Sequence, residues 1–258
     1  MAEGEGIWVY GVVGADAPVP DGLAGVDGRH PVELVQGGGV AALASAVPLD
    51  EFSAEALRSR LEDLERLEAL ARAHERVLEA ALAHGPVVPF RLCTIYESRP
   101  HLAEMLGREG ERLAAALARL DGVSEWGVKA FLASPAAAAA AAPGAEAGAA
   151  RSGTDYLRRR REQRAAAEAA RDATDAALEV LHARLAEQAA DAVLSRPQDP
   201  RLSGRAGEMV LNGAYLLANG RVEGFRALVE SLAREHARDG LELELTGPWP
   251  AYHFVEAA

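Results

Sequence analysis

The chain has 258 residues, of which 49% are hydrophobic and 26% are charged, the balance of a globular protein that can bury a core. Its net charge of −12 argues against binding nucleic acid through a general field, because phosphate neutralisation needs a basic surface. The single cysteine, Cys93, excludes an internal disulfide and any paired-cysteine metal or redox motif. We therefore expect the protein to be located in the reducing cytoplasm. We expect no signal peptide and no membrane span, because no run approaches the roughly 20 apolar residues that cross a bilayer.

The first half of the chain passes from strand patterns to helix patterns. Three β-rich segments come first, and the triple glycine at residues 37–39 predicts a turn with positive φ. Ser53 then suits an N-cap, and leucines at spacings of three and four predict one amphipathic helix of about eight turns. Pro100 suits the first turn of a second helix. The predicted strands are residues 7–13, 31–36, 40–47 and 87–90, and the predicted helices are residues 53–84 and 98–120.

The second half predicts the order β-α-β-α-β. Its first strand places Trp126 on one side with other apolar residues, and the alanine-rich residues 134–151 form a low-complexity insertion. The order is close to a split βαβ, ferredoxin-like layout. The predicted strands are residues 123–132, 208–218 and 241–245, and the predicted helices are residues 154–194 and 222–238.

These patterns predict an α+β protein of two domains. Residues 1–120 form an N-terminal α+β domain with a mixed sheet and a long amphipathic helix, and residues 121–258 form a modified ferredoxin-like domain that carries the insertion.

The end of the chain carries a specific pattern. Three leucines alternate with Glu242 and Glu244 over residues 241–245, which indicates a strand with one buried and one solvated face. The strand is expected to stop at a rigid turn, in which Pro248 and Pro250 hold Trp249 at low entropic cost.

Residues that could carry chemistry have simpler interpretations. The run Arg158-Arg159-Arg160-Arg161 could bind phosphate or an acidic partner, but consecutive residues point about 100° apart, so a solvated helix start is favoured. His74 lies on the apolar face of its helix and Cys93 lacks any nucleophile signature, so both are interpreted as packed residues. The sequence contains no nucleotide-binding glycine motif and no metal-ligand spacing, so we predict no catalytic, cofactor-binding or metal-binding residue.

Eight segments follow one another along nearly the whole chain. They are Trp8-Val9-Tyr10-Gly11-Val12, Val47-Pro48-Leu49-Asp50-Glu51-Phe52, Leu61-Glu62-Asp63-Leu64 through Arg76-Val77, Pro86-Val87-Val88-Pro89-Phe90-Arg91, Glu125-Trp126-Gly127-Val128-Lys129, Gly153-Thr154-Asp155-Tyr156-Leu157, Asn212-Gly213-Ala214-Tyr215-Leu216 and Leu245-Thr246-Gly247-Pro248-Trp249-Pro250. Together, in this order, they resemble the gas vesicle accessory proteins of the F/L type. The segment after Arg91, which includes Cys93 and Ile95, departs from the family pattern, and the F and L subgroups are not separated.

The resemblance implies a non-enzymatic accessory or minor structural protein of gas vesicle assembly, located in the cytoplasm and at the gas vesicle. Its expected partners are the hydrophobic shell subunit and other accessory proteins, and neither a membrane nor nucleic acid. The shell subunit would be captured by strand addition or by a helix in a groove. The candidate contact residues are Trp126, Pro248, Trp249, Pro250 and Tyr252, with core packing as the alternative role of the two tryptophans.

Two other classes of function remain open from the sequence. A nucleic-acid-binding ferredoxin-like protein would show a basic sheet face with stacking aromatics and steep salt dependence. An enzyme on the same scaffold would gather titratable residues in a pocket, and fold alone does not decide between these classes.

Overall fold

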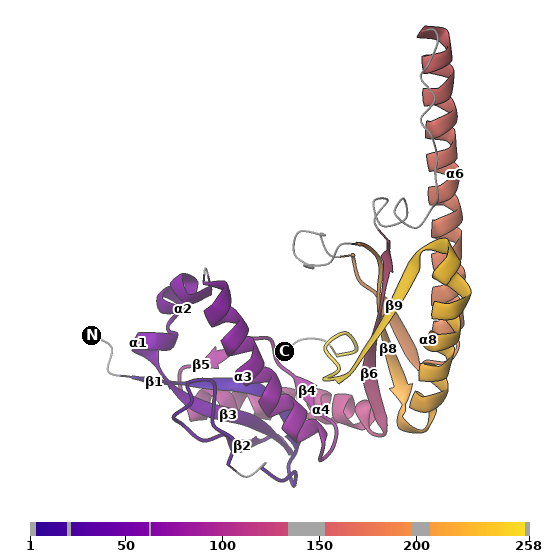
Figure 1. Ribbon diagram of the computed structural model, residues 1–258. Helices are drawn as coiled ribbons and strands as arrows, with labels where there is room; N and C mark the ends of the chain where they lie inside the picture. The colour runs from indigo at the N-terminus through magenta and orange to yellow at the C-terminus, as the bar shows by residue number, and fades with distance from the viewer. Residues whose placement is uncertain (1–3, 20–21, 62, 134–152, 198–206, 256–258) are drawn as a thin grey trace. The chain divides into compact units, whose positions relative to one another are not determined.

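The structure is a computed structural model that describes residues 4–19, 22–61, 63–133, 153–197 and 207–255 (Figure 1). The chain divides into two compact units, Met1–Glu125 with Pro248–Ala258, and Trp126–Gly247. The predicted domains, residues 1–120 and 121–258, differ from these units chiefly at the C-terminus, because the segment from Pro248 onward belongs to the first unit. The predicted insertion at residues 134–151 lies outside the described residues.

The first unit contains a five-stranded antiparallel sheet. Its order is β2-β3-β1-β4, and β5 also pairs with β1. The predicted mixed sheet is therefore wrong. Strands β3 and β4 run in the same direction, but β1 lies between them and pairs antiparallel with each. The strands are β1 (Glu5–Gly14), β2 (Glu33–Gly37), β3 (Val40–Pro48), β4 (Val88–Pro89) and β5 (Ile95–Tyr96).

The predicted glycine turn between β2 and β3 is confirmed. Gly38 and Gly39 have φ angles of 59° and 79°, which glycine adopts without strain. The turn packs closely on α4 (Arg99–Leu120), where a Cβ on Gly38 would clash with the carbonyl oxygen of Leu106. Ser98 caps α4 by accepting a hydrogen bond from the backbone of His101 (3.4 Å), so this helix begins where the sequence predicts.

The predicted single helix at residues 53–84 is wrong, because the described residues of that range form two helices, α2 (Ala54–Leu61) and α3 (Leu64–Leu82), and a separate short helix, α1 (Leu49–Phe52), precedes them. Asp63 starts α3, since its side chain accepts hydrogen bonds from the backbone N–H groups of Glu65 (3.1 Å) and Arg66 (3.3 Å). An aspartate that caps a helix in this way competes with continuation of the preceding one.

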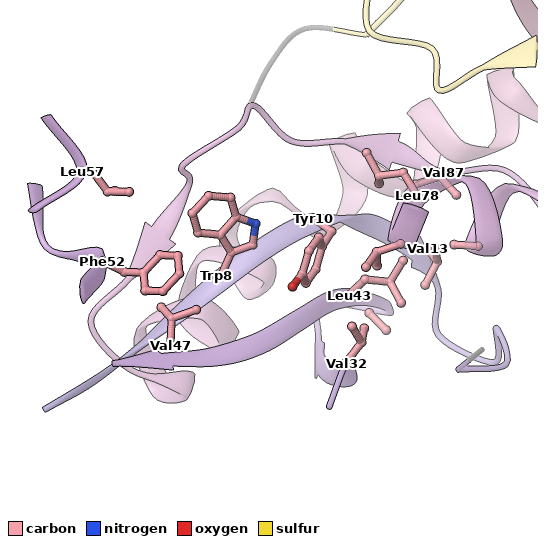
Figure 2. Packing of buried hydrophobic residues seen from close by; sticks show 13 residues of the cluster. Trp8, Tyr10, Val13, Val32, Leu43, Val47, Phe52, Leu57, Leu78 and Val87 are labelled. Carbon is pink, nitrogen blue, oxygen red and sulfur yellow. The ribbon is translucent and has the colours of Figure 1, made fainter. Parts of the chain in front are cut away.

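The core of the first unit forms where α3 packs on the sheet (Figure 2). Trp8 and Tyr10 of β1 are fully buried, and the Trp8 ring meets Phe52 edge-on with centroids 5.9 Å apart. His74 is 1% exposed, which confirms its interpretation as a packed histidine. Its Nδ1 accepts a hydrogen bond from Trp8 Nε1 (3.0 Å), so its Nε2 carries the proton and donates to the Phe90 carbonyl (3.3 Å).

The second unit contains a four-stranded sheet with the order β7-β8-β6-β9. Two helices pack on it, and Leu181 and Leu185 of the first helix meet Phe225 of the second over β6 and β8. The sheet elements are β6 (Val123–Leu132), β7 (Asp191–Leu194), β8 (Glu208–Ala218) and β9 (Leu241–Trp249), and the helices are α6 (Gly153–Ala186) and α8 (Val222–His236), with short 3₁₀ turns at Asn219–Arg221 and Ala237–Asp239.

Two predicted boundaries in this unit are wrong. The helix predicted to reach residue 194 ends at Ala186, and the chain then forms β7, which pairs antiparallel with β8. In the described part of the unit, the order is therefore β-α-β-β-α-β. Strand β9 does not stop at Leu245 but continues to Trp249. Gly247 within it adopts φ 123°, and Pro248 is tolerated because a proline in an edge strand need not remove a ladder hydrogen bond.

Candidate functional site

The predicted contact residues fall into buried and exposed groups. Trp249 is 38% exposed and Pro248 is exposed, whereas Pro250 is buried and Tyr252 is half-buried. Trp126 is 4% exposed within the core of the second unit. Its ring is covered by the guanidinium of Arg226, which lies 4.6 Å from the ring centroid, a cation–π contact. Trp126 thus has the surroundings of a core residue, while Trp249 presents indole surface to solvent.

The C-terminal segment that follows Trp249 is fixed to the first unit by side-chain and backbone contacts. The Tyr252 hydroxyl donates to Glu75 Oε1 of α3 (2.8 Å). Arg119 of α4 donates to the carbonyl oxygen of Phe254 (3.1 Å). Two short turns stiffen the segment, because the Tyr252 N–H donates to the Pro250 carbonyl (2.7 Å) and the Phe254 N–H donates to the Ala251 carbonyl (3.3 Å). The backbone next to Trp249 is therefore held in place.

A histidine–carboxylate pair adds to this anchoring. The buried carboxylate of Glu125 accepts a hydrogen bond from the His253 backbone N–H (3.1 Å) and pairs with His253 Nδ1 (2.7 Å). The hydrogen bond to Glu125 raises the pKa of His253 above its usual value, although burial of the ring opposes this. Burial also raises the pKa of Glu75, while the hydrogen bond from Tyr252 opposes that rise.

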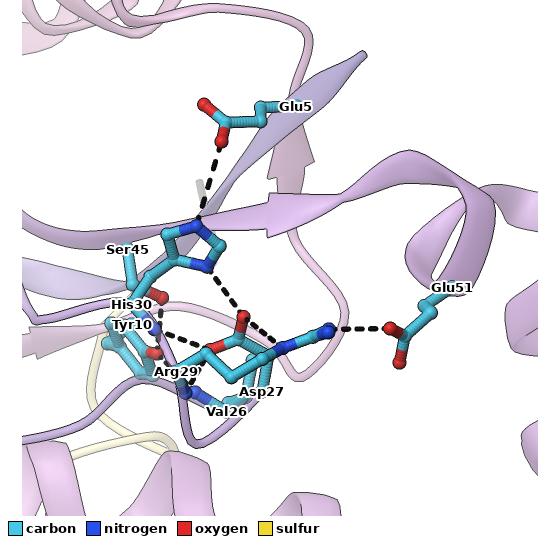
Figure 3. Close-up of polar contacts among 8 residues, drawn as sticks. All are labelled: Glu5, Tyr10, Val26, Asp27, Arg29, His30, Ser45 and Glu51. Carbon is cyan, nitrogen blue, oxygen red and sulfur yellow. Dashed lines mark hydrogen bonds and ion pairs between the residues drawn. The ribbon is translucent and has the colours of Figure 1, made fainter. Parts of the chain in front are cut away.

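A second polar cluster fixes the loop between β1 and β2 (Figure 3). Asp27 Oδ1 accepts hydrogen bonds from the backbone N–H groups of Arg29 (3.0 Å) and His30 (3.1 Å), and its Oδ2 pairs with His30 Nδ1 (2.6 Å). Burial opposes ionisation of Asp27, but these hydrogen bonds and the nearby His30 together lower its pKa. The Arg29 guanidinium also reaches Glu51 (2.5 Å). The sequence analysis missed this cluster, whose only signal is an Asp two and three residues before an Arg-His pair.

The cluster borders a cavity of about 350 Å³ at the start of α3. The Asp27 carboxylate at its wall is already occupied by backbone and histidine donors, and Glu51 is paired with Arg29. The arrangement therefore holds a loop and offers no paired nucleophile and base. The lining residues are Val26, Asp27, Glu51, Phe52, Arg66, Leu67, Ala69 and Leu70.

Tyr10 joins this loop to the sheet. Its hydroxyl accepts a hydrogen bond from the Val26 N–H (2.9 Å) and lies 2.8 Å from Ser45 Oγ of β3. Burial raises the pKa of Tyr10 to about 12, so its phenol stays protonated.

The remaining residues that could carry chemistry are packed or dispersed. Burial raises the pKa of the half-buried Cys93 thiol, which disfavours the thiolate that a nucleophile needs. Within the described ranges, no cluster of three or more histidine, cysteine, aspartate or glutamate residues could hold a metal ion. Among the helices that the structure describes, none is long and apolar enough to cross a membrane.

Comparisons with known proteins identify the family. The family model described as "Gas vesicle synthesis protein GvpL/GvpF" matches residues 6–256. Gas vesicle protein L of Streptomyces sp. (strain CB03234) is 39% identical over 253 residues, which cover 97% of this chain and 93% of that protein. Gas vesicle protein F of the same strain is 30% identical over 260 residues, with coverages of 96% and 99%.

Two crystal structures share the fold. GvpF from Anabaena sp. PCC7120 aligns with a TM-score of 0.69 at 19% identity, over 98% of this chain and 97% of that one. GvpF from Microcystis aeruginosa aligns with a TM-score of 0.66 at 21% identity, over 97% and 99%. The α+β architecture with two antiparallel sheets is thus a GvpF-like fold. The chain belongs to the GvpL/GvpF family of gas vesicle proteins, which is a structural and accessory family and not an enzymatic one.

Proposed function

We propose that this protein acts in gas vesicle assembly by binding the hydrophobic shell subunit and other accessory proteins, without making or breaking bonds. The observation that carries the proposal is the exposure of Trp249 on an anchored backbone. An aromatic side chain that is 38% exposed and held at low entropic cost has the character of an interface hot spot.

Strand β9 suggests how a partner would be bound. Among the strands that the structure describes, it is the last in the order β7-β8-β6-β9, so a further strand can add on its far side. The opposite edge is a poorer template. Strand β7 has only four residues, and the Ala192 N–H is engaged by the side chain of Asp191 (2.9 Å). We therefore assign strand addition to β9, with Trp249 as the apolar contact at its end.

The acidic side chains of β9 disfavour its pairing with a second copy of the same strand. Leu243 and Leu245 pack partly against the core of their unit, while the acidic Glu242 and Glu244 alternate with them. Acidic side chains on an edge strand oppose pairing with a second acidic copy. The net charge of −12 would also keep a complex with a hydrophobic subunit dispersed.

The proposal includes a modified ferredoxin-like fold for the second unit. The element order β6-α6-β7-β8-α8-β9 and the strand order β7-β8-β6-β9 support it, since both are those of a split βαβ unit with two helices packed on one antiparallel sheet.

A quantitative binding experiment tests the role of Trp249. Purified shell subunit is titrated against the wild-type protein and the Trp249→Ala variant after both show equal thermal stability. Loss of a hot-spot tryptophan is expected to weaken binding about 30-fold. The matched control is Val180→Ala, which removes another exposed apolar side chain, on α6, and should bind like the wild type. Equal affinity of Trp249→Ala and wild type would eliminate Trp249 as a contact.

A further inference from the structure

The first half of α6 has no packing role within its unit. Every residue from Tyr156 to Ala173 is exposed, and burial begins only where Leu178, Leu181 and Leu185 meet the core. In Figure 1 this half of the helix extends past the ends of the strands of its own unit. Its alanines favour helix without tertiary support. We call residues 156–173 the arm.

One face of the arm is rich in arginine and has a net positive charge, although Glu168 lies on the same face between Arg164 and Arg171. Arg160, Arg161, Arg164 and Arg171 follow Leu157 at helical spacings that place them on one side, over about 21 Å at 1.5 Å per residue. The four consecutive arginines alone would diverge around the helix, but Arg164 and Arg171 return to the face of Arg160 and Arg161. Together these four arginines form what we call the basic stripe. Leu157, at the end of the stripe, is 60% exposed.

The contacts within the arm leave the arginines of the basic stripe exposed to a partner. Arg158, on the other side of the helix, pairs with Glu162 (3.9 Å). Arg160 donates to the Tyr156 hydroxyl (3.0 Å) and lies over its ring at 6.0 Å, which orients the guanidinium along the arm. Arginine binds carboxylates through two parallel hydrogen bonds, so a row of arginines fits a row of acidic side chains.

The charge of the chain is divided unequally between the two units. The first unit holds 22 acidic and 11 basic side chains, a net charge of −11, and the second holds 17 and 16, a net charge of −1. The first unit of another copy is therefore a strongly acidic surface that is present wherever this protein is present.

One part of the first unit is complementary to the stripe in charge and, like the stripe, has an exposed leucine beside it. At the start of α3, Leu64 is 78% exposed, and Asp63, Glu65 and Glu68 around it are exposed as well. Arg66 pairs with Asp63 and Arg72 pairs with Glu68, so these charges balance, and Glu65 gives the region its net negative charge. Asp63, Leu64, Glu65 and Glu68 form what we call the Leu64 patch. An exposed leucine among acids is the counterpart of Leu157 beside the arginines.

We propose that the basic stripe of one copy binds the Leu64 patch of a second copy. Such a contact is heterologous, because the two surfaces differ, so each bound copy still offers one free stripe or patch and the copies associate head to tail. The contact is weak and sensitive to salt, since its ion pairs lie at an exposed surface. It uses residues other than β9 and Trp249, so it does not depend on the proposed shell-subunit contact.

Sedimentation velocity with charge-reversed variants tests the contact. The wild type at high concentration is expected to associate at about 0.05 M NaCl and to dissociate at about 0.5 M, where screening is much stronger. The stripe variant, Arg160→Glu with Arg164→Glu, and the patch variant, Glu65→Arg with Glu68→Arg, should each be monomeric. An equimolar mixture of the two variants should associate again, because every reversed surface then finds an opposite charge.

A matched control separates this contact from a general charge effect. Arg234→Glu with Arg238→Glu changes the net charge of the second unit by the same amount at exposed positions outside the arm, and should associate like the wild type. A monomeric wild type at low salt, or a mixture of variants that stays monomeric, overturns the proposal. Binding of a single-stranded oligonucleotide to the stripe in place of self-association would also overturn it, in favour of a nucleic-acid partner.

Discussion

At the residue scale, the buried histidine of the first unit links pH to stability. Burial lowers the pKa of His74 to about 4 from 6.5, although the hydrogen bond to the Phe90 carbonyl opposes this. Between these two values the unfolded chain binds a proton that the folded chain does not, so stability is full above pH 6.5 and falls as the pH drops towards 4. The expected loss from this group is about 3 kcal/mol.

Denaturant unfolding of the wild type and His74→Gln between pH 4 and 7 measures this effect. Glutamine can accept from Trp8 and donate to Phe90 but does not titrate, so the variant should lose less stability in acid. Parallel curves for the two proteins would show that His74 is not the source of the acid sensitivity.

His253 behaves in the opposite sense. Its pKa is raised by the hydrogen bond to Glu125, so its contribution to stability is present below the unfolded value of 6.5 and is lost as the pH rises through the folded value. The His253 pKa measured by NMR titration should return towards 6.5 in Glu125→Gln, because the uncharged amide no longer favours the imidazolium. A His253 pKa that does not change would contradict the pairing.

Single residues differ in how far the sequence indicates their roles. The place of His74 on an apolar helix face predicts a packed histidine, and the structure confirms it. The Asp27 cluster could not be predicted from the sequence, because it forms only when its loop folds back on itself and when Glu51, which lies farther along the chain, comes close to Arg29. The exposure of Trp249 and the burial of Trp126 could not be separated either, since core packing was an open role both for Trp126 in its predicted strand and for Trp249 in the predicted turn.

At the element scale, Asp63 is the residue that separates α2 from α3. Its carboxylate accepts from two backbone N–H groups that would otherwise be unsatisfied, so Asp63→Ala should destabilise the protein by about 1 kcal/mol in chemical denaturation. Asp63→Asn keeps the acceptor oxygen and should cost only a few tenths of that amount. Equal losses for the two variants would point to the Arg66 ion pair instead of the cap.

The elements that the sequence predicts well are those with a clear period or cap. Residues 123–132 and 208–218 match β6 and β8, and Ser98 marks the start of α4. Strand β7 was missed because the apolar residues before it continue the helical pattern of α6, and only pairing with β8 makes it a strand. The sequence predicts one helix in place of α2 and α3 for the same reason, since the spacing of the leucines does not change at Asp63.

At the scale of the whole molecule, the chain returns to its first unit after completing the second. The rigid proline-rich end of the sequence indicates a docked segment but not that it joins the first unit, because the contacts that define the return link residues far apart, such as Tyr252 with Glu75 and Phe254 with Arg119. Tyr252 also packs against the core cluster that contains Trp8. The end of the chain is therefore a structural part of the first unit.

Because the C-terminal segment belongs to the first unit, a substitution in it is expected to destabilise the first unit and not the second. Tyr252→Ala removes a half-buried ring and takes away the hydrogen bond to Glu75 Oε1, while Glu75 Oε2 already has no partner among the described residues, so a loss of about 2 kcal/mol is expected. Hydrogen exchange should show faster opening of α3 and β1, while the β7–β8 pair, whose core is separate, keeps its protection. Tyr156→Ala, which removes an exposed tyrosine from α6, should change stability by less than about 0.5 kcal/mol. If hydrogen exchange accelerates in β7 and β8 as much as in α3, the two cores open together and the prediction is wrong.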